Sequence, residues 1–243
     1  MAGVTIGIAG WSLARPDAGL FPAPGSGSAL QRYAAVFGAV EINSSFYRPH
    51  KPETYARWAD SVPPGFRFAV KLPRTVTHEK RLQDTSPELD RFAAEAGALH
   101  EKLGWVLVQT PPSLRFDPAA ASALFTGLRQ RLAGPLLACE ARHGSWFDAD
   151  ATALLRGLDV IRVVADPPAG TPGPFIATSS SASYVRLHGS PQIYRSPYEP
   201  ERLQRVASWL AAQPGQALVI FDNTMSGTQA RQARMLADLL HAS

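Results

Sequence analysis

Five charged or titratable side chains stand at or just after the ends of short β-type runs that are far apart in the sequence. They are Glu41, Lys71, Glu140, His188 and Asp222. Carboxylates and imidazoles give and take protons, and an ammonium group binds or polarises an oxyanion. A set of this kind indicates general acid/base chemistry, provided that the fold brings its members together.

Eight runs rich in β-branched and aliphatic residues predict strands, and stretches with helical spacing lie between them. The strands are expected at residues 4–10, 39–43, 66–71, 105–109, 136–140, 160–166, 184–188 and 218–223. The clearest helix is expected over 88–102, and Asp117 before Pro118 predicts the start of another. Strands that alternate with helices form parallel βαβ units, and eight units in 243 residues match a barrel.

The predicted fold class is therefore α/β, a single (β/α)8 TIM barrel in one domain over residues 1–243. An open doubly wound sheet is the alternative, but the turn after the first strand, GWSLARPDAG, lacks a GxGxxG pattern. Residues 167–182 carry Pro, Gly and Ser where the sixth helix should stand. We expect this connection between the sixth and seventh strands to lack a full helix.

Strand parity selects the side chains that face the barrel interior, because side chains alternate along a strand. The parity not used by helix-facing apolar residues turns these residues inward: Glu41, Asn43, Lys71, Gln109, Glu140, Arg162, Val164, Asp166, Tyr184, Arg186, His188 and Asp222. Cys139 takes the other parity and is expected to be a buried, inert thiol. Because burying many unpaired ions is costly, the rim is expected to be an open, wet pocket.

The rim combines acidic and basic residues, which favours a clamp for a carboxylate or phosphate over a pure metal site. The candidate catalytic residues are Glu41, Lys71, His78, Glu140 and His188. The candidate ligand-binding residues are Trp11, Asn43, Tyr47, Gln109, Arg142, Trp146, Arg186, Asp222, Asn223, Ser226 and Gly227. Mutual salt bridging across the rim is the alternative interpretation of the same charges.

Ser226 and Gly227 open the last predicted helix, in the loop NTMSGTQA. Loops after strands seven and eight of this fold frequently hold a phosphate, because free N–H groups and the helix dipole meet there. A simple N-cap by Ser226 explains the pattern equally well. The aromatic residues of the rim loops, such as Trp11 and Trp146, either wall a pocket or cover the barrel end.

Composition restricts the partners. Lys and Arg number 24 against 20 Asp and Glu, and the charges are scattered, so nucleic acid is not an expected partner, although the pI near 9.5 keeps it as an alternative. No apolar run approaches a membrane span, and the N-terminus lacks a basic leader segment, so we expect no membrane partner and a cytoplasmic location. The single cysteine, Cys139, excludes an internal disulfide and fits a reducing compartment.

Seven strings follow one another in order: GIAGW, EINSSFYRP, FRFAVKLPRTVTH, VQTPPS, CEARHGSWF, YVRLHG and FDNTMSGTQA. Together they resemble the YecE-like family, also called domain of unknown function 72. The resemblance implies a TIM barrel with a pocket at the carboxyl ends of the strands, and it implies no specific activity. It points to Glu41, Asn43, Tyr47, Lys71, His78, Gln109, Glu140, Arg142, Trp146, Arg186, His188 and Asn223. Many relatives read F-N-N where this chain has Phe221, Asp222 and Asn223, which leaves the role of Asp222 open.

The main hypothesis is an enzyme that applies general acid/base chemistry to a small anionic or sugar-phosphate-like metabolite bound at the rim. The second is a metal-dependent hydrolase or isomerase of the barrel type, with Glu41, Glu140, Asp166, His188 and Asp222 as candidate ligands. No HxH or HExxH spacing supports a metal site, so no cofactor is predicted and a divalent metal remains the alternative. The third is a non-catalytic barrel that binds a ligand or nucleic acid. The sequence assigns neither the substrate nor the reaction.

Overall fold

The computed structural model describes residues 3–168, 177–223, 225 and 227–241. Its strands are Val4–Ala9 (β1), Ala39–Ile42 (β2), Arg67–Lys71 (β3), Leu103–Gln109 (β4), Leu136–Glu140 (β5), Val160–Arg162 (β6), Val164–Asp166 (β7), Ala182–Leu187 (β8) and Gln216–Phe221 (β9). They form one sheet in the order β6-β5-β4-β3-β2-β1-β9-β8-β7, and every pair in it is parallel. All carboxyl ends of the strands therefore lie at the same rim.

β6 and β7 together occupy the place of the predicted sixth strand. β6 pairs with β5, and β7 pairs with β8 on the opposite side. Val163 stands between the two halves, and its N–H donates to the carbonyl oxygen of Cys139 at 2.9 Å. The chain thus passes from one neighbouring strand to the other and brings the two ends of the sheet together in a nearly closed barrel. The predicted (β/α)8 TIM-barrel class is confirmed.

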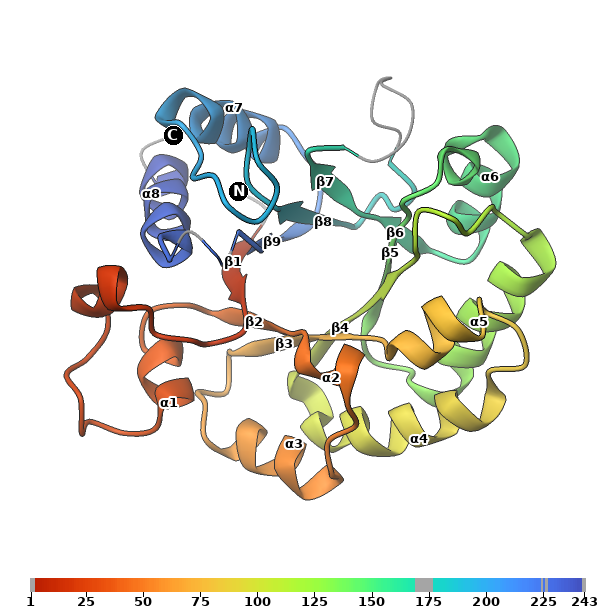
Figure 1. Cartoon of the computed structure of the whole chain (residues 1–243), viewed down its shortest axis with the longest axis horizontal. Helices are drawn as coiled ribbons and strands as arrows, with labels where there is room; N and C mark the ends of the chain where they lie inside the picture. The colour runs from red at the N-terminus through yellow and green to blue at the C-terminus, as the bar shows by residue number, and fades with distance from the viewer. Residues whose placement is uncertain (1–2, 169–176, 224, 226, 242–243) are drawn as a thin grey trace.

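The α-helices surround the strands in an outer ring (Figure 1). They are Ala29–Ala34 (α1), Ser44–Tyr47 (α2), Pro52–Asp60 (α3), Ser86–Ala96 (α4), Pro118–Arg131 (α5), Ala149–Gly157 (α6), Pro200–Ala211 (α7) and Gln229–His241 (α8). Short 3-10 turns lie at Arg15–Leu20 (η1), Gly97–Lys102 (η3) and Gly144–Phe147 (η4), and a π turn lies at Thr75–Glu79 (η2). Within the described ranges, no helix has both the length and the apolar character that a membrane crossing requires.

The helix boundaries follow local signals. Asp117 caps α5, since its Oδ1 accepts hydrogen bonds from the N–H groups of Ala119 and Ala120 at 2.9 and 3.1 Å, as predicted. The helix expected over 88–102 is shorter, because α4 gives way at Gly97 to the 3-10 turn η3, in which His100 has a φ of 51°. The middle of the irregular connection 167–182, residues 169–176, lies outside the described residues, and its described flanks contain no helix.

Two apolar clusters divide the core. The larger one lies between strands and helices and includes Val40, Ile42 and Cys139. The smaller one fills the barrel and includes Ala39, Ala69, Leu107, Ala138 and Tyr184. This division confirms the predicted parity of the second, third, fourth, fifth and seventh strands. Cys139 is 1% exposed, and burial raises its pKa to about 12, in line with an inert thiol.

The predicted parity of the sixth strand is wrong. Ile161 and Val163 belong to the interior cluster, while Arg162 points into the helix layer. There Nη2 of Arg162 donates to the carbonyl oxygen of Trp146 and to Oγ1 of Thr152, both at 2.9 Å. Both parities of VIRVVAD carry apolar residues, so alternation holds no signal in this strand and the charged residue was assigned to the wrong side.

Val164 and Asp166 follow the same corrected parity. Val164 packs against the outer cluster. Asp166 forms a double hydrogen bond with Arg202 of α7, at 3.0 and 2.6 Å, in place of facing the interior. Neither residue joins the groups that gather inside the barrel.

Tyr33 of α1 forms hydrogen bonds to both β1 and β2 from the helix layer. Its substitution measures how much this layer contributes to stability. Its hydroxyl donates to the carbonyl oxygen of Ala39 at 2.7 Å and accepts from the N–H of Ile8 at 2.9 Å, and the side chain is fully buried. Because Tyr33→Phe removes both of these buried hydrogen bonds, we expect the free energy of unfolding to fall by about 1–3 kcal/mol in urea titrations. Tyr47→Phe removes a hydroxyl from a side chain that is 74% exposed and should change it by less than about 0.5 kcal/mol. Equal stability of the two variants would contradict this account.

Candidate functional site

The carboxyl ends of five strands carry a compact group of charged side chains. Its members are Glu41 in β2, Lys71 at the end of β3, Glu140 at the end of β5, Arg186 in β8, His188 directly after β8 and Asp222 directly after β9. In barrels of this class the chemistry is found at this rim. The fold therefore brings the five residues noted first in the sequence to one place.

Arg186 lies at the centre of this group and has no exposed surface. Its Nε and Nη2 donate to the two carboxylate oxygens of Glu41 at 2.9 and 2.6 Å. Its Nη1 donates to Oε2 of Glu140 at 2.5 Å, and Nη2 also donates to Oδ2 of Asp222 at 2.8 Å. One guanidinium thus joins three acidic residues. We call Glu41, Glu140, Arg186, His188 and Asp222 the Arg186 network.

His188 lies between two of these carboxylates. Its Nδ1 is 3.1 Å from Oδ2 of Asp222, and its Nε2 is 3.0 Å from Oε1 of Glu140. A doubly protonated ring offers an N–H to each acceptor. Burial alone would lower the pKa of His188, but the hydrogen bonds to Asp222 and Glu140 outweigh it and raise this pKa. The geometry thus favours a positively charged His188.

Arg142 adds a cation at the edge of the network. Its Nη2 pairs with Oε1 of Glu140 and lies 3.1 Å from Nε2 of His188, because both donors converge on the same carboxylate oxygen. Burial would raise the pKa of Glu140, but the charge of Arg186, followed by His188 and Arg142, holds it well below its usual range. The pKa of Asp222 is lowered in the same way, because Arg186 and His188 overcome the effect of burial.

Tyr184 of β8 forms a hydrogen bond to the network from inside the barrel. Its hydroxyl donates to Oε2 of Glu41 at 2.6 Å. Burial, and then the charge of Glu41, raise the pKa of Tyr184 well above its ordinary value, so the hydroxyl keeps the proton that it donates. Parity predicted that Tyr184 faces inward, but not this role. The signal was present, since Tyr184 stands two residues before Arg186 and therefore on the same face of the strand.

The expectation of an open, wet rim is wrong at the centre of the network. Glu41, Arg186 and His188 have no exposed surface, and Glu140 is 1% exposed. The salt-bridged alternative describes this part correctly, since each buried charge has partners that offset its desolvation. Towards the solvent, the side chains of Asp222 and Arg142 remain 12% and 17% exposed.

Lys71 stands next to the network without joining it. It is 8% exposed, and among the described residues no hydrogen bond or ion pair engages its Nζ. The three carboxylates of the network already face Arg186, Arg142 and His188, whose pKa is raised, so among the described residues each of them has a partner other than Lys71. Burial and the positive charge of Arg186 lower the pKa of Lys71 to about 8, although the carboxylates act in the opposite direction.

Lys71 and His78 both contact the aromatic ring of Phe46 in α2. The Nζ of Lys71 lies 4.2 Å from the ring centroid, and the imidazole of His78 packs edge-on at 4.9 Å. Nδ1 of His78 is 2.8 Å from Oγ1 of Thr77 in η2. Burial, and then the positive charges of Lys71 and Arg74, lower the pKa of His78, so its imidazole is neutral at pH 7. Tyr47 touches the same ring at 5.0 Å and is otherwise exposed.

Two further predicted residues lie beside the network. Nε2 of Gln109 donates to Oε2 of Glu140 at 3.1 Å. Asn43 follows β2 and is half-buried. Its Oδ1 and the Nε of Arg142 are buried atoms without a hydrogen-bond partner in the described part of the chain. Such atoms are rare in folded proteins and indicate a position where a ligand or water completes the bonding.

Three predicted ligand-binding residues, Trp146, Trp11 and Asn223, make contacts within the fold. Trp146 has no exposed surface and packs against Phe116 at 5.1 Å, so it does not wall a pocket. Trp11 packs edge-on against Trp58 of α3 at 4.9 Å. Nδ2 of Asn223 donates to a glutamine of α8 at 2.8 Å and thereby fixes that helix to the strand end.

The N-terminus of α8 is already occupied by a carboxylate of the chain itself. Oδ2 of Asp17 accepts from the N–H groups of Ala230 and Arg231, both at 3.1 Å, and Asp17 is 2% exposed. These two N–H groups of α8 therefore already have an acceptor, and the phosphate expected at the loop before the helix stays a prediction. Ser226 lies outside the described residues, and Gly227, with a φ of 66°, lies close to Pro16 of η1. Asp17 stands 213 residues before Ala230, so local sequence gave no sign of this cap.

The carboxylates that were candidate metal ligands point at a guanidinium, which repels a divalent cation. In residues 3–168, 177–223, 225 and 227–241, no group of three or more His, Cys, Asp or Glu side chains is arranged to hold a metal ion. Asp166, one of those candidates, belongs to the ion pair with Arg202 described above.

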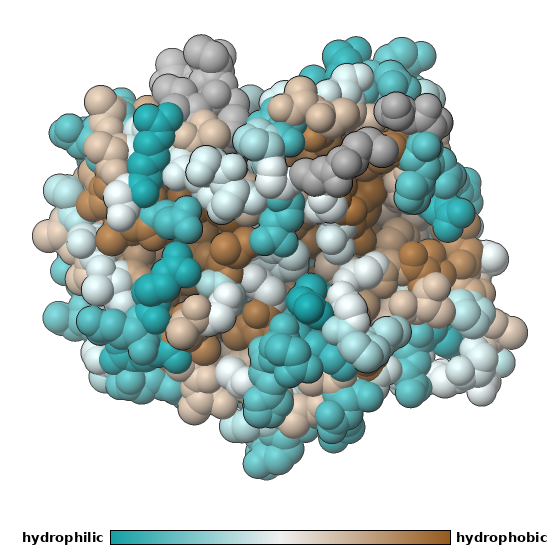
Figure 2. Space-filling model, turned by 180° about the vertical axis from the view of Figure 1, so that it is seen from behind, coloured by the Kyte–Doolittle hydropathy of each residue, from teal (hydrophilic) through white to brown (hydrophobic). Residues whose placement is uncertain are grey.

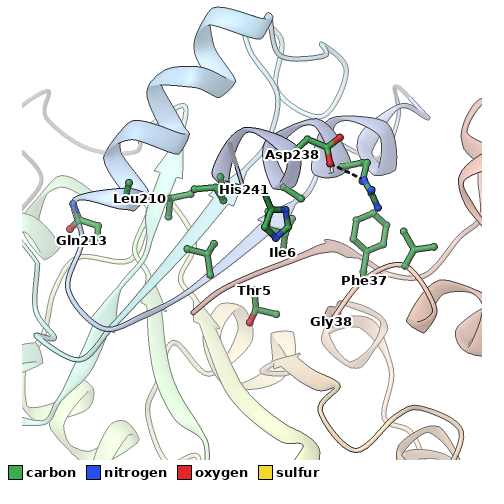
Figure 3. Close-up of a pocket in the computed structure, with 14 residues that line it drawn as sticks. Thr5, Ile6, Phe37, Gly38, Leu210, Gln213, Asp238 and His241 are labelled. Atoms are coloured by element: carbon green, nitrogen blue, oxygen red, sulfur yellow. Dashed lines mark hydrogen bonds and ion pairs between the residues drawn. The ribbon is translucent and has the colours of Figure 1, made fainter. Parts of the chain in front are cut away.

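A cavity of about 490 Å³ lies at the opposite end of the barrel, between the start of β1 and the ends of α7 and α8 (Figure 3). Ile6, Phe37 and Leu210 are among the residues that line it, and its charged residues Arg234 and Asp238 pair with each other at 3.1 Å. The view from behind shows hydrophobic residues gathered between hydrophilic ones (Figure 2). None of the network residues lines this cavity, so the candidate site remains at the carboxyl-terminal rim.

Residues 5–243 match the family described as "Protein of unknown function DUF72". The chain belongs to this family. The DUF72 chain is 30% identical to the UPF0759 protein YecE of Escherichia coli K12 over 144 residues, which cover 57% of this chain and 52% of YecE, about half the length of that relative. It is 26% identical to the UPF0759 protein YunF of Bacillus subtilis 168 over 270 residues, covering 98% of this chain and 94% of YunF.

The solved structures agree with this assignment. A DUF72 family protein from Thermotoga maritima is 26% identical to this DUF72 chain, with a TM-score of 0.80 and coverage of 98% of this chain and 99% of that chain. The resemblance to the YecE-like family that the sequence strings indicated is thereby confirmed.

Removal of Arg186 should make stability depend on pH with a definite sign. The lowered pKa values of Glu140 and Asp222 contribute stability that is present above their ordinary values of 4.5 and 3.8 and is lost as the pH falls through the folded values. In Arg186→Met, burial without the cation favours protonated carboxyls. We expect a loss of about 3–5 kcal/mol at pH 8 and a clearly smaller loss at pH 5, from urea unfolding.

Arg91→Met is the matched control, because Arg91 is half exposed and pairs only within its helix. It should cost less than about 1 kcal/mol at both pH values. A loss in Arg186→Met that is equal at both pH values, or larger at pH 5, would contradict the network.

His188 and His78 should titrate on opposite sides of their ordinary pKa of 6.5. NMR titration of 13C-labelled histidine rings, assigned through loss of one signal in His188→Gln and another in His78→Gln, measures both midpoints. Because the pKa of His188 is raised, its contribution to stability is complete below pH 6.5 and is lost as the pH rises through the raised value. A midpoint of His188 at or below that of His78 would refute the arrangement.

Proposed function

We propose that this DUF72 chain is an enzyme that applies general acid/base chemistry to a small anionic or sugar-phosphate-like metabolite at the carboxyl-terminal rim. The observation that carries the proposal is Lys71, an almost buried amine that pairs with no acid in the described part of the chain and lies beside a network whose carboxylates already have other partners. Burial of an unpaired amine lowers stability, so retaining it needs another reason, and amines with a lowered pKa serve as catalytic groups.

An anionic ligand follows from the charges. Among the described residues, protonated Lys71 forms no ion pair, and the Nε of Arg142 is a buried donor without an acceptor. A phosphate or carboxylate supplies both a negative charge and acceptor oxygens. The half-buried Asn43 adds a polar oxygen at the same rim, which suits a ligand hydroxyl.

The groups that exchange protons with the ligand are those on the solvent side of the network. With a pKa of about 8, Lys71 is about one-tenth neutral at pH 7 and is able to accept a proton. His78 is a second neutral base on the same Phe46 ring. Glu41, Glu140 and His188, which the sequence offered as acids or bases, are sealed from solvent. In this proposal they fix the charge around Lys71 and position it.

Isothermal titration calorimetry tests the proposal with inorganic phosphate, dihydroxyacetone phosphate and ribose 5-phosphate as probes. We expect at least one to bind, with affinity about tenfold or more weaker in Lys71→Met. The affinity of the wild type should fall as the pH rises through about 8, because the amine then loses its charge. Lys51→Met, which removes an exposed lysine at the start of α3, is the control and should leave the affinity unchanged. Absence of binding by the wild type, or equal affinity in Lys71→Met, would refute an anion site at Lys71.

A further inference from the structure

The surroundings of Lys71 permit its neutral, nucleophilic form. Arg186, Arg142 and protonated His188 already balance the three carboxylates of the network, so loss of the Lys71 proton leaves no carboxylate without a cation. No hydrogen bond or ion pair within the described residues occupies the lone pair or the protons of Nζ. An amine attacks a carbonyl carbon when it is neutral and its lone pair is not engaged in another interaction.

Phe46 provides the apolar wall that such a reaction needs. Its ring is 8% exposed and lies 4.2 Å from Nζ of Lys71. An aromatic face keeps water away on one side and attracts a cation on that same side. It therefore accommodates the neutral amine before the reaction and a positively charged iminium after it.

A proton acceptor stands on the same ring. The imidazole of His78 packs on Phe46 at 4.9 Å, and Nζ of Lys71 lies 4.2 Å from the centroid of the same ring, so the two groups are neighbours. A neutral imidazole removes the proton that the amine loses when it adds to a carbonyl group. Among the charged side chains of the network and its edge, Asp222 and Arg142 are partly exposed to solvent.

We infer that Nζ of Lys71 forms an imine with the aldehyde or ketone group of a small anionic carbonyl compound, such as a sugar phosphate in its open-chain form. This inference rests on the proposed function and names the substrate class of that site. The C–N bond forms as the amine attacks the carbonyl carbon, and a proton moves from nitrogen to the carbonyl oxygen to give a carbinolamine. The oxygen then takes up a second proton, which comes from the solvent, the C–O bond breaks, water leaves, and an iminium that carries this positive charge remains. No oxidant or reductant takes part.

Reductive methylation with formaldehyde and cyanoborohydride at pH 7 tests the nucleophile without requiring an anionic ligand. Formaldehyde is a neutral carbonyl compound and is small enough to reach Nζ. We expect peptide mass spectrometry to show that Lys71 is modified at least about tenfold faster than the exposed Lys51, because a pKa of about 8 leaves about one-tenth of Lys71 neutral at pH 7. A rate at Lys71 equal to or below that at Lys51 would overturn the inference.

Trapping of an anionic ketone tests the substrate class. The chain is incubated with dihydroxyacetone phosphate and cyanoborohydride, and the adduct is located by peptide mapping. We expect one adduct per chain, on Lys71, and at least a tenfold loss of adduct in Lys71→Arg, which keeps a charge but not the nucleophile. Lys51→Arg is the matched control and should retain the adduct.

The outcomes of the two proposals are distinguishable. If calorimetry shows that dihydroxyacetone phosphate binds through Lys71 but no adduct forms there, the proposed anion site stands and the imine is overturned. An adduct spread over exposed lysines, unchanged in Lys71→Arg, overturns it as well. If no anionic probe binds and formaldehyde still modifies Lys71 fastest, the amine is confirmed as a nucleophile and the anionic substrate class is overturned.

Discussion

The interaction on which the site depends is the contact of one buried guanidinium with three carboxylates. Glu41, Glu140 and Asp222 come from strands that are far apart in the sequence, and each would carry a large desolvation cost without Arg186. Because the guanidinium is planar and has five N–H donors, it serves several acceptors at once, which an ammonium group does less well. This contact lowers the pKa of Glu140 and Asp222, and these two carboxylates in turn raise the pKa of His188.

The pairing within the Arg186 network also determines the surroundings of Lys71, at the end of β3. Within the described ranges the three carboxylates of the network already have other partners and no further acid pairs with Lys71, so this amine lies between the positively charged Arg186 and the ring of Phe46. Stability alone would favour an apolar residue or a paired lysine at that position. Lys102 shows the paired case within the same chain, since its Nζ donates to the carbonyl oxygens of Ala59 and Val62 at 2.6 and 2.8 Å. The contrast between these two buried lysines supports a functional role for Lys71.

Period-two patterning in the sequence was sufficient to predict the fold class and most of the inner face, because Glu41, Lys71, Glu140 and Arg186 stand in strands whose other parity is clearly apolar. It failed for Arg162, where both parities are apolar and only tertiary packing against Trp146 decides. Patterning also failed where the partner comes from a distant segment. It predicted neither that Asp17 caps the start of α8 nor that Arg186 and its carboxylate partners are almost completely buried. Residue types indicated which groups meet, but whether a charge is paired or free depends on side-chain geometry that no local pattern encodes.

The most direct test of the account is the titration of the Lys71 amine itself. NMR of a 13C-labelled lysine side chain, assigned by loss of its signal in Lys71→Arg, gives the midpoint of Lys71 beside those of the exposed lysines. We expect a midpoint of about 8 for Lys71, clearly below the ordinary lysine value of 10.5. A midpoint at or above the ordinary lysine value of 10.5 would show that an acid pairs with this amine and would contradict the charge balance from which the proposals follow.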